Sequence, residues 1–134
     1  MVERLVANEK VEGSNPFARS IQNMEKLHEK KCITHNGTIP PLNESEIKKY
    51  LNLLDGWSVK SNVDKIFYLE KEYKFKNFIE SQNFVSKVGL VAELESHHPD
   101  ISFGWGYTKI KIFTHAIRGL AENDFVLAAK VDQI

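Results

Sequence analysis

The chain has 134 residues, of which 42% are hydrophobic and 27% charged, and its 18 Lys and Arg balance 18 Asp and Glu. This length suits one domain with one core, and the balanced charge argues against a basic nucleic-acid binder. The single cysteine, Cys32, excludes an internal disulfide framework and a cysteine-based zinc site, and it fits a cytoplasmic protein. No apolar run reaches the roughly 18 residues of a membrane span, and MVERLVANEK is a poor signal peptide, so we expect no membrane partner.

Residues 1–39 differ from the rest of the chain because they lack a sustained helical or strand period. We expect a disordered extension or arm here, followed by a domain over residues 40–134. Residues 13–16 read GSNP, which is what the T-arm of a transfer-RNA gene, GGTTCGAATCCC, encodes when it is read as codons. Two hypotheses follow for residues 1–23: an upstream gene included by a mis-called start, with translation beginning at Met24, or a genuine disordered tail.

Seven elements are predicted along the domain. Asn43 and Glu46 form a capping box that begins a helix, and Asp55–Gly56 ends it. Hydrophobic periodicity then predicts strands over 57–59 and 66–75, a helix over 77–95, strands over 101–105 and 107–115, and a helix over 124–134. Pairs of strands separated by helices predict an α+β fold, an antiparallel sheet covered by helices on one face.

Three of the five histidines lie close together in the sequence: His97 and His98 precede Pro99, and His115 ends an alternating strand. Imidazole titrates near neutral pH, so one protonated and one neutral histidine can act as acid and base together. Glu93, four residues before His97, and Asp124, in the first turn of the last helix, could orient such rings.

Three interpretations of these residues stay open on chemistry alone. Adjacent histidines can be a polar helix terminus, and Asp124 an ordinary helix-start acid. They can be a proton-transfer site for elimination, isomerisation or tautomerisation. His97, His98 and Glu93 can also form a facial metal triad, although the familiar His-Glu-x-x-His spacing is absent. Trp105 is either a stacking surface for a flat ligand or a half-buried strand aromatic.

The spacing of these residues resembles the signature of the pterin-4a-carbinolamine dehydratases. The pattern is E-x3-H-H-P-x5-W-x9-H-x8-D, and the segment THAIRGLAENDFVLAAKVDQI also has the family's order of Thr-His, Gly-Leu, Asp and Leu-Ala. The resemblance extends back through Phe75–Phe78, Gly56–Trp57 and Leu42, so it covers residues 40 to 134.

The resemblance implies a four-stranded antiparallel sheet with three helices on one face. It implies a hydro-lyase that dehydrates 4a-hydroxytetrahydropterin to quinonoid dihydropterin in tetrahydrobiopterin recycling, without metal or cofactor. The only small-molecule partner would be the pterin, and the protein would be a homodimer or homotetramer. Carried over by position, the acid–base and substrate-binding histidines would be His97, His98 and His115, supported by the carboxylates Glu93 and Asp124, with Trp105 and Pro99 against the substrate.

Two positions depart from the family pattern. Ala121 stands where the family usually has Ser or Thr, so the last helix lacks a side-chain cap worth about 1 kcal/mol, which could loosen Asp124. Ala116 follows the third histidine in place of an acidic or amide residue, which removes one hydrogen bond from the expected site. The alternative function is a non-catalytic one, because some relatives act as dimerisation or assembly cofactors on the same fold.

Overall fold

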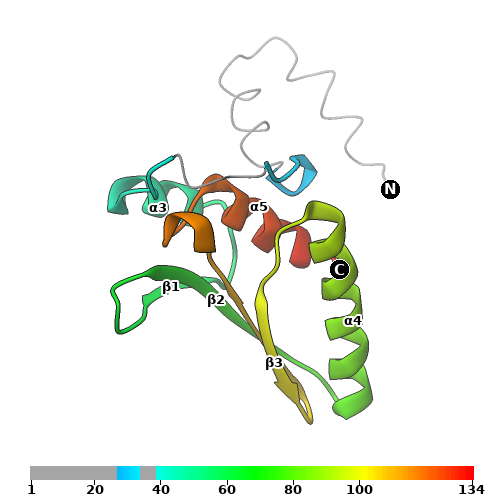
Figure 1. Cartoon of the computed structure of the whole chain (residues 1–134). Coiled ribbons are helices and arrows are strands. Elements are labelled where there is room, and N and C mark those ends of the chain that lie inside the picture. The colour runs from blue at the N-terminus through cyan, green and yellow to red at the C-terminus, as the bar shows by residue number, and fades with distance from the viewer. Residues whose placement is uncertain (1–26, 34–38) are drawn as a thin grey trace, which may run out of the picture.

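The computed structural model describes residues 27–33 and 39–134, and Figure 1 shows the arrangement of its elements. Both hypotheses for residues 1–23, and the suggested start at Met24, lie outside the described residues. The elements in chain order are η1 (Leu27–Glu29), α3 (Glu44–Leu51), β1 (Ser58–Ser61), β2 (Phe67–Lys74), α4 (Phe78–Glu95), β3 (Asp100–Gly104), β4 (Tyr107–Ile112), η2 (His115–Ile117) and α5 (Glu122–Val131).

The four strands form one antiparallel sheet in the order β1-β2-β4-β3, and the three α-helices lie on one of its faces (Figure 1). Leu69 of β2 pairs with Ile112 of β4, and Ile110 of β4 pairs with Ile101 of β3. The predicted α+β class and the order helix, two strands, helix, two strands, helix are therefore confirmed.

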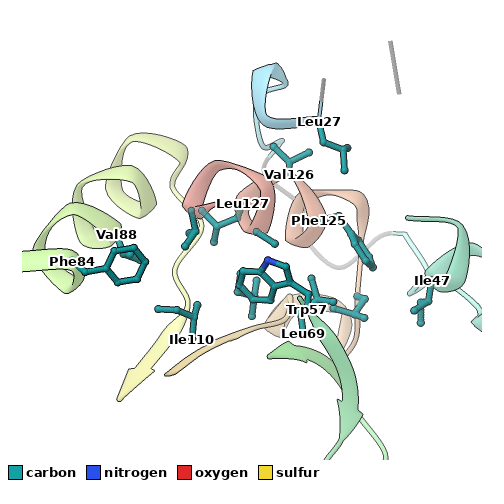
Figure 2. Close-up of a cluster of buried hydrophobic side chains, with 14 residues drawn as sticks. Leu27, Ile47, Trp57, Leu69, Phe84, Val88, Ile110, Phe125, Val126 and Leu127 are labelled. Carbon is teal, nitrogen blue, oxygen red and sulfur yellow. The ribbon is translucent and has the colours of Figure 1, made fainter. Parts of the chain in front are cut away.

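The core lies between this sheet and α5 (Figure 2). Successive strand residues point to opposite faces, and the alternation over 107–115 predicts one inward set. All four members of that set are buried: Thr108, Ile110, Ile112 and Thr114. On the helix side, Phe125 and Leu127 are both fully buried. Each such apolar side chain contributes about 1.5–3 kcal/mol of transfer free energy to folding, so β4 and α5 are firmly joined.

Asparagine side chains begin two of the three helices. The Asn43 side chain accepts a hydrogen bond from the Glu46 N–H at 2.9 Å, while the Glu46 carboxylate accepts one from the Asn43 N–H at 3.0 Å. This is the predicted capping box. Asn77 caps α4 in the same way by accepting from the Glu80 N–H at 3.0 Å. The first helix ends earlier than predicted, at Leu51, and irregular turns carry the chain to the positive-φ Gly56.

Strand β4 is shorter than predicted, because it ends at Ile112 and not at His115. Thr114 and Gly119 then pair across a tight loop, with hydrogen bonds of 2.8 and 3.4 Å between their backbones. A Cβ at Gly119 would lie 2.7 Å from the Pro41 Cβ, so glycine permits this close approach. His115 therefore begins the short helix η2 inside a closed loop, and does not extend the strand.

Residues 27–33 were predicted to belong to a disordered arm, but the structure packs them on α5. Leu27 is only 3% exposed and joins the core cluster (Figure 2). The Lys130 ammonium, on α5, donates to the His28 carbonyl at 2.8 Å and so fixes η1 to the helix. Helix α5 is consequently covered by the sheet on one side and by this segment on the other, which explains its uninterrupted buried run, residues 123–128.

The far end of α5 is fixed to the sheet by Asp132. Its carboxylate accepts hydrogen bonds from Trp57 Nε1 at 3.0 Å, Lys71 Nζ at 2.8 Å and the Tyr73 hydroxyl at 2.5 Å. The Lys71 ammonium also lies 4.8 Å from the centre of the Tyr73 ring. Lys71 is the one charged residue on the apolar face of β2, and this partner explains its position.

Candidate active site

The end of α4 sets the directions of the two adjacent histidines. The helix stops at Glu95, and Ser96 adopts a left-handed conformation with φ of 54°. The Ser96 N–H donates to the Glu93 carbonyl and the His97 N–H to the Ala92 carbonyl, each at 3.2 Å. This left-handed cap satisfies the last helical carbonyls. It also reverses the chain, so that His97 points off the helix axis toward α5.

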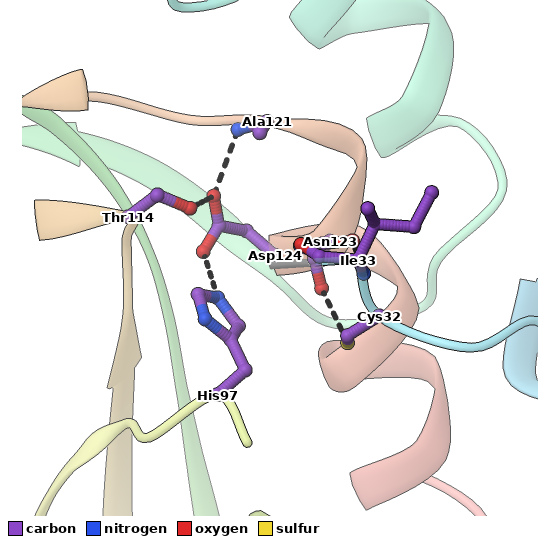
Figure 3. A network of polar contacts seen from close by, with 7 residues as sticks. All are labelled: Cys32, Ile33, His97, Thr114, Ala121, Asn123 and Asp124. Atoms are coloured by element: carbon purple, nitrogen blue, oxygen red, sulfur yellow. Dashed lines mark hydrogen bonds and ion pairs between the residues drawn. The ribbon is translucent and has the colours of Figure 1, made fainter. Parts of the chain in front are cut away.

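His97 is held by the buried carboxylate of Asp124 (Figure 3). Its Nε2 lies 2.6 Å from Asp124 Oδ1, and the Asp124 side chain is fully buried. The second carboxylate oxygen accepts from Thr114 Oγ1 and from the Ala121 N–H, both at 2.8 Å. An ionised carboxylate is only an acceptor, so a bond to it requires the proton on Nε2. Within the described residues, no hydrogen bond reaches the other ring nitrogen of His97, Nδ1.

Ala121 does not loosen this arrangement. It has no side-chain acceptor for the Asp124 N–H, so the reciprocal cap is half complete. The other half is present, because the Asp124 carboxylate accepts from the Ala121 backbone N–H. The helix start therefore lacks a side-chain cap, as the sequence predicted, and the Asp124 N–H donates to the Ala121 carbonyl at 3.1 Å instead. The Asp124 carboxylate is nevertheless fixed by three donors.

His98 pairs with Glu93, whose carboxylate lies 2.6 Å from His98 Nε2. Both side chains are more than half exposed. The spacing of four residues suggested that Glu93 would serve His97, but the left-handed Ser96 turns His97 away and brings His98 to the carboxylate. The two adjacent histidines thus have different partners: a buried acid on α5 and an exposed acid on α4.

His115 projects from η2, on the loop closed by Thr114 and Gly119. Its ring lies against the ring of Phe113, with 4.2 Å between the ring centres. Within residues 27–33 and 39–134, no side-chain hydrogen bond or ion pair reaches the His115 ring. This imidazole is exposed and able to take either proton-transfer role.

One pocket of about 330 Å³ brings the three histidines together. That volume suits a small flat molecule. Pro99, predicted to contact substrate, is part of its wall, and so is Ala116. The full set of lining residues is Ile33, Ser96, His97, His98, Pro99, Asp100, Thr114, His115, Ala116 and Asn123.

Trp105 does not belong to this pocket. It lies in the turn between β3 and β4, at the opposite end of β3 from Asp100, and it is 73% exposed. The two glycines that flank Trp105 make a tight hairpin, which carries the indole away from the histidines. The expected wall for a flat ring is therefore absent from the pocket in one copy of the chain.

The suggested metal triad is not assembled. Within the described residues, no group of three or more His, Cys, Asp and Glu side chains is placed to hold a metal ion. His97 and His98 turn toward different carboxylates, so they do not converge with Glu93 on one point.

Sequence reasoning missed three residues that shape the site. Thr114 was assigned only to a strand face, yet its hydroxyl donates to Asp124. Asn123 and Ile33 line the pocket although they are 90 residues apart in the chain. The spacing of polar residues cannot predict a contact between residues so far apart in the chain. The one available signal was Asn123 itself, a second polar residue next to Asp124 in the first turn of the helix.

Glu95, the last residue of α4, keeps its charge through specific partners. Burial would raise the pKa of Glu95, but the Cys32 N–H, which donates at 2.9 Å, and the nearby Lys130 hold it below its usual value. The same surroundings act oppositely on the thiol: burial, then the charge of Glu95, raises the pKa of Cys32 to about 12. Cys32 is therefore protonated at neutral pH and is not a ready nucleophile.

Comparisons to known proteins agree with the fold and show the family. The family model for pterin 4 alpha carbinolamine dehydratase matches residues 40–134, and the chain belongs to that family. A protein of Rubrobacter xylanophilus named "Putative pterin-4-alpha-carbinolamine dehydratase" is 47% identical, over 83% of this chain and all of its own length. One of the same name from Alkaliphilus metalliredigens is 48% identical, over 82% of this chain and 96% of its own.

Two solved structures share the architecture. A transcriptional coactivator/pterin dehydratase from Brucella melitensis is 31% identical, with a TM-score of 0.62 over 69% of this chain and 96% of that one. A pterin dehydratase-like protein identified as a RuBisCO assembly factor is 22% identical, with a TM-score of 0.50 over 59% of this chain and 88% of that one. The second likeness concerns the fold alone. In the described parts of this chain, no helix combines the length and apolar character needed to cross a bilayer.

Proposed function

We propose that this protein dehydrates 4a-hydroxytetrahydropterin to quinonoid dihydropterin and water by histidine acid–base catalysis. The observation that carries the proposal is the pocket in which three imidazoles meet, one of them oriented by a fully buried carboxylate. Membership of the dehydratase family supplies the substrate class.

The reaction needs one proton delivered and one removed. An imidazolium gives a proton to the hydroxyl on C4a, and the C–O bond breaks to release water. The lone pair of the adjacent ring nitrogen forms the new carbon–nitrogen double bond, and a neutral imidazole takes the proton from that nitrogen. The histidine pair ends with its protonation states exchanged, and one proton transfer restores it.

His97 and His115 are the proposed proton-transfer pair. The bond from Nε2 to Asp124 fixes the tautomer and direction of the His97 ring, so that Nδ1 is the atom left to exchange a proton. His115 faces the same pocket from another element and has no competing partner among the described residues. His98, tied to Glu93 in an exposed pair, is proposed to bind substrate or assist.

The test is stopped-flow absorbance of 4a-hydroxytetrahydropterin decay, measured with and without chelator. We expect the wild type to accelerate dehydration, and the double variant His97→Ala with His115→Ala to lose on the order of 10²–10⁴ in rate. His28→Ala is the matched control, since His28 lies on η1 outside the pocket, and we expect it to keep full activity.

A folded wild type that gives only the uncatalysed rate would overturn this proposal. The non-catalytic role as a dimerisation or assembly cofactor would then become the leading hypothesis. Inhibition by chelator would instead favour a metal-dependent lyase. The homodimer or homotetramer stays a prediction, which size-exclusion chromatography with light scattering checks. The cytoplasmic location and the place in tetrahydrobiopterin recycling also stay predictions.

A further inference from the structure

The segment from Lys30 to Ile33, outside the part of the chain that the family model matches, is fixed beside the histidine pocket. Asn123 holds it from α5. This side chain is only 6% exposed, and its amide oxygen accepts from the Ile33 N–H at 2.9 Å. Its amide nitrogen donates to the Ile33 carbonyl. One buried amide thus satisfies both backbone polar groups of one residue, a pairing specific for amide geometry.

Two further bonds attach the segment to elements that position His97. The Glu95 carboxylate, two residues before His97, accepts from the Cys32 N–H at 2.9 Å. Glu122, two residues before Asp124, accepts from Lys30 Nζ at 2.5 Å. The end of α4 and the first turn of α5 therefore hold both the histidine and this segment, as the neighbouring positions of Asn123 and Asp124 in Figure 3 show.

Ile33 brings an apolar side chain to a pocket whose other lining residues are mostly polar. It is 67% exposed, although its backbone is fully bonded, so its side chain is the part presented to solvent. A large exposed aliphatic group beside a ligand-sized cavity gains free energy when a ligand covers it. Trp105 lies at the far end of β3 and lines no part of this pocket. Among the lining residues, Ile33 has the largest aliphatic side chain.

We propose that Ile33, positioned by the amide of Asn123, is a wall of the substrate site and contributes to pterin binding but not to proton transfer. This inference rests on the proposed function. It assigns to residues 30–33 a role in substrate affinity, and it makes Asn123 a positioning residue that acts through Ile33.

The test separates binding from chemistry. Equilibrium binding of 7,8-dihydrobiopterin is followed by fluorescence, and KM and kcat are measured by stopped-flow dehydration. We expect Ile33→Ala to weaken binding and raise KM about fivefold with kcat unchanged. Asn123→Ala should do the same, and the double variant should be no worse than either single one, because both changes remove the same wall.

Two controls account for general destabilisation. Asn43→Ala removes an amide that also bonds backbone, at the start of α3 and away from the pocket, and we expect lower thermal stability with normal KM. Val63→Ala shortens an aliphatic side chain that is 95% exposed and outside the pocket, and we expect no change.

The outcomes distinguish the two proposals. If the wild type binds dihydrobiopterin without turnover, the proposed function fails, and the binding measurements still decide the role of Ile33. If turnover is normal and neither variant changes KM or binding, the proposal that Ile33 is a wall of the substrate site is wrong. A loss of kcat in Asn123→Ala at unchanged KM would also overturn it, by showing that Asn123 acts on the histidines. No dihydrobiopterin binding by the wild type, together with only the uncatalysed dehydration rate, would overturn both proposals.

Discussion

Both ends of α5 are anchored by a buried or half-buried aspartate, but only the aspartate at the N-terminal end is bonded to a residue that lines the histidine pocket. Asp124 in the first turn and Asp132 just after the last turn each accept three hydrogen bonds. At the Asp132 end, all donors are side chains of the sheet and its approach, and the cluster joins helix to sheet. At the Asp124 end, one donor is an imidazole that borders an open pocket. A satisfied carboxylate becomes part of a reactive site when one of its donors can itself exchange a proton with a ligand.

The largest expected effect comes from Asp124→Asn. The amide cannot accept from three donors, so His97 loses its fixed orientation and a buried group is left mismatched. We expect the dehydration rate to fall on the order of 10²-fold, and the free energy of unfolding to fall by about 2–3 kcal/mol. Stopped-flow kinetics and urea unfolding measure the two effects. An unchanged rate in a folded variant would contradict the role given to Asp124.

Asp132→Asn makes the matching change at the other end of the helix. Lys71 and Asp132 are both about one-fifth exposed, so the pair is partly screened. We expect a loss of about 2 kcal/mol in the free energy of unfolding and a dehydration rate within about twofold of wild type. A rate loss comparable to that of Asp124→Asn would show that the two ends are not functionally distinct.

Ala121→Ser completes the half-made cap beside Asp124. A serine hydroxyl can accept from the Asp124 N–H while the carboxylate keeps its bond from the residue 121 N–H. We expect a gain of about 1 kcal/mol in unfolding free energy, read from urea titration, with unchanged rate. A loss of stability would mean that the buried position, 2% exposed, has no room for the hydroxyl.

The last effect is absent at neutral pH and appears only at alkaline pH. The pKa of Cys32 is raised to about 12 from 9.0, first by burial and then by Glu95. Its stabilising contribution is therefore complete below pH 9 and is lost as pH rises toward 12, because the unfolded thiol releases its proton first. We expect the unfolding free energy of wild type to fall more steeply above pH 9 than that of Cys32→Ser.

Comparing the wild type with Cys32→Ser removes the contribution of a second group that titrates at alkaline pH. Burial, and then the bond to Asp132, raise the pKa of Tyr73, and this group titrates in both proteins. Parallel slopes for the wild type and Cys32→Ser would contradict the shift at Cys32. Urea unfolding at several pH values between 8 and 11 measures the slopes.

Local signals predicted the fold well. The Asn43 capping box, the long helix α4 and the inward set of β4 depend on residues close in sequence, where periodicity and capping chemistry act. The end of β4 was missed, because the pairing of Thr114 with Gly119 continues the alternation while the chain already turns back. Proline at position 99 indicated the end of α4, but not the left-handed Ser96 that directs the histidines.

The sequence named residues that the structure brings to one pocket, but it did not give their arrangement. All three histidines and Pro99 line one pocket, although the carboxylate partners of His97 and His98 could not be read from spacing. Trp105 was assigned to the pocket by resemblance, and a hairpin turn places it elsewhere. Ile33 was missed because its contact with Asn123 crosses 90 residues and depends on tertiary packing alone.

The docking of η1 on α5 has a consequence for synthesis of the chain on the ribosome. Leu27 is made before every strand of the sheet, but the side chains that cover and bond its segment, including Val126 and Lys130, are made in the last helix. During translation, Leu27 therefore stays exposed to solvent until the rest of the domain has emerged. We therefore expect the segment that contains Leu27 to dock last in the cell, although it is synthesised first. A nascent chain stalled before α5 should be bound by chaperones.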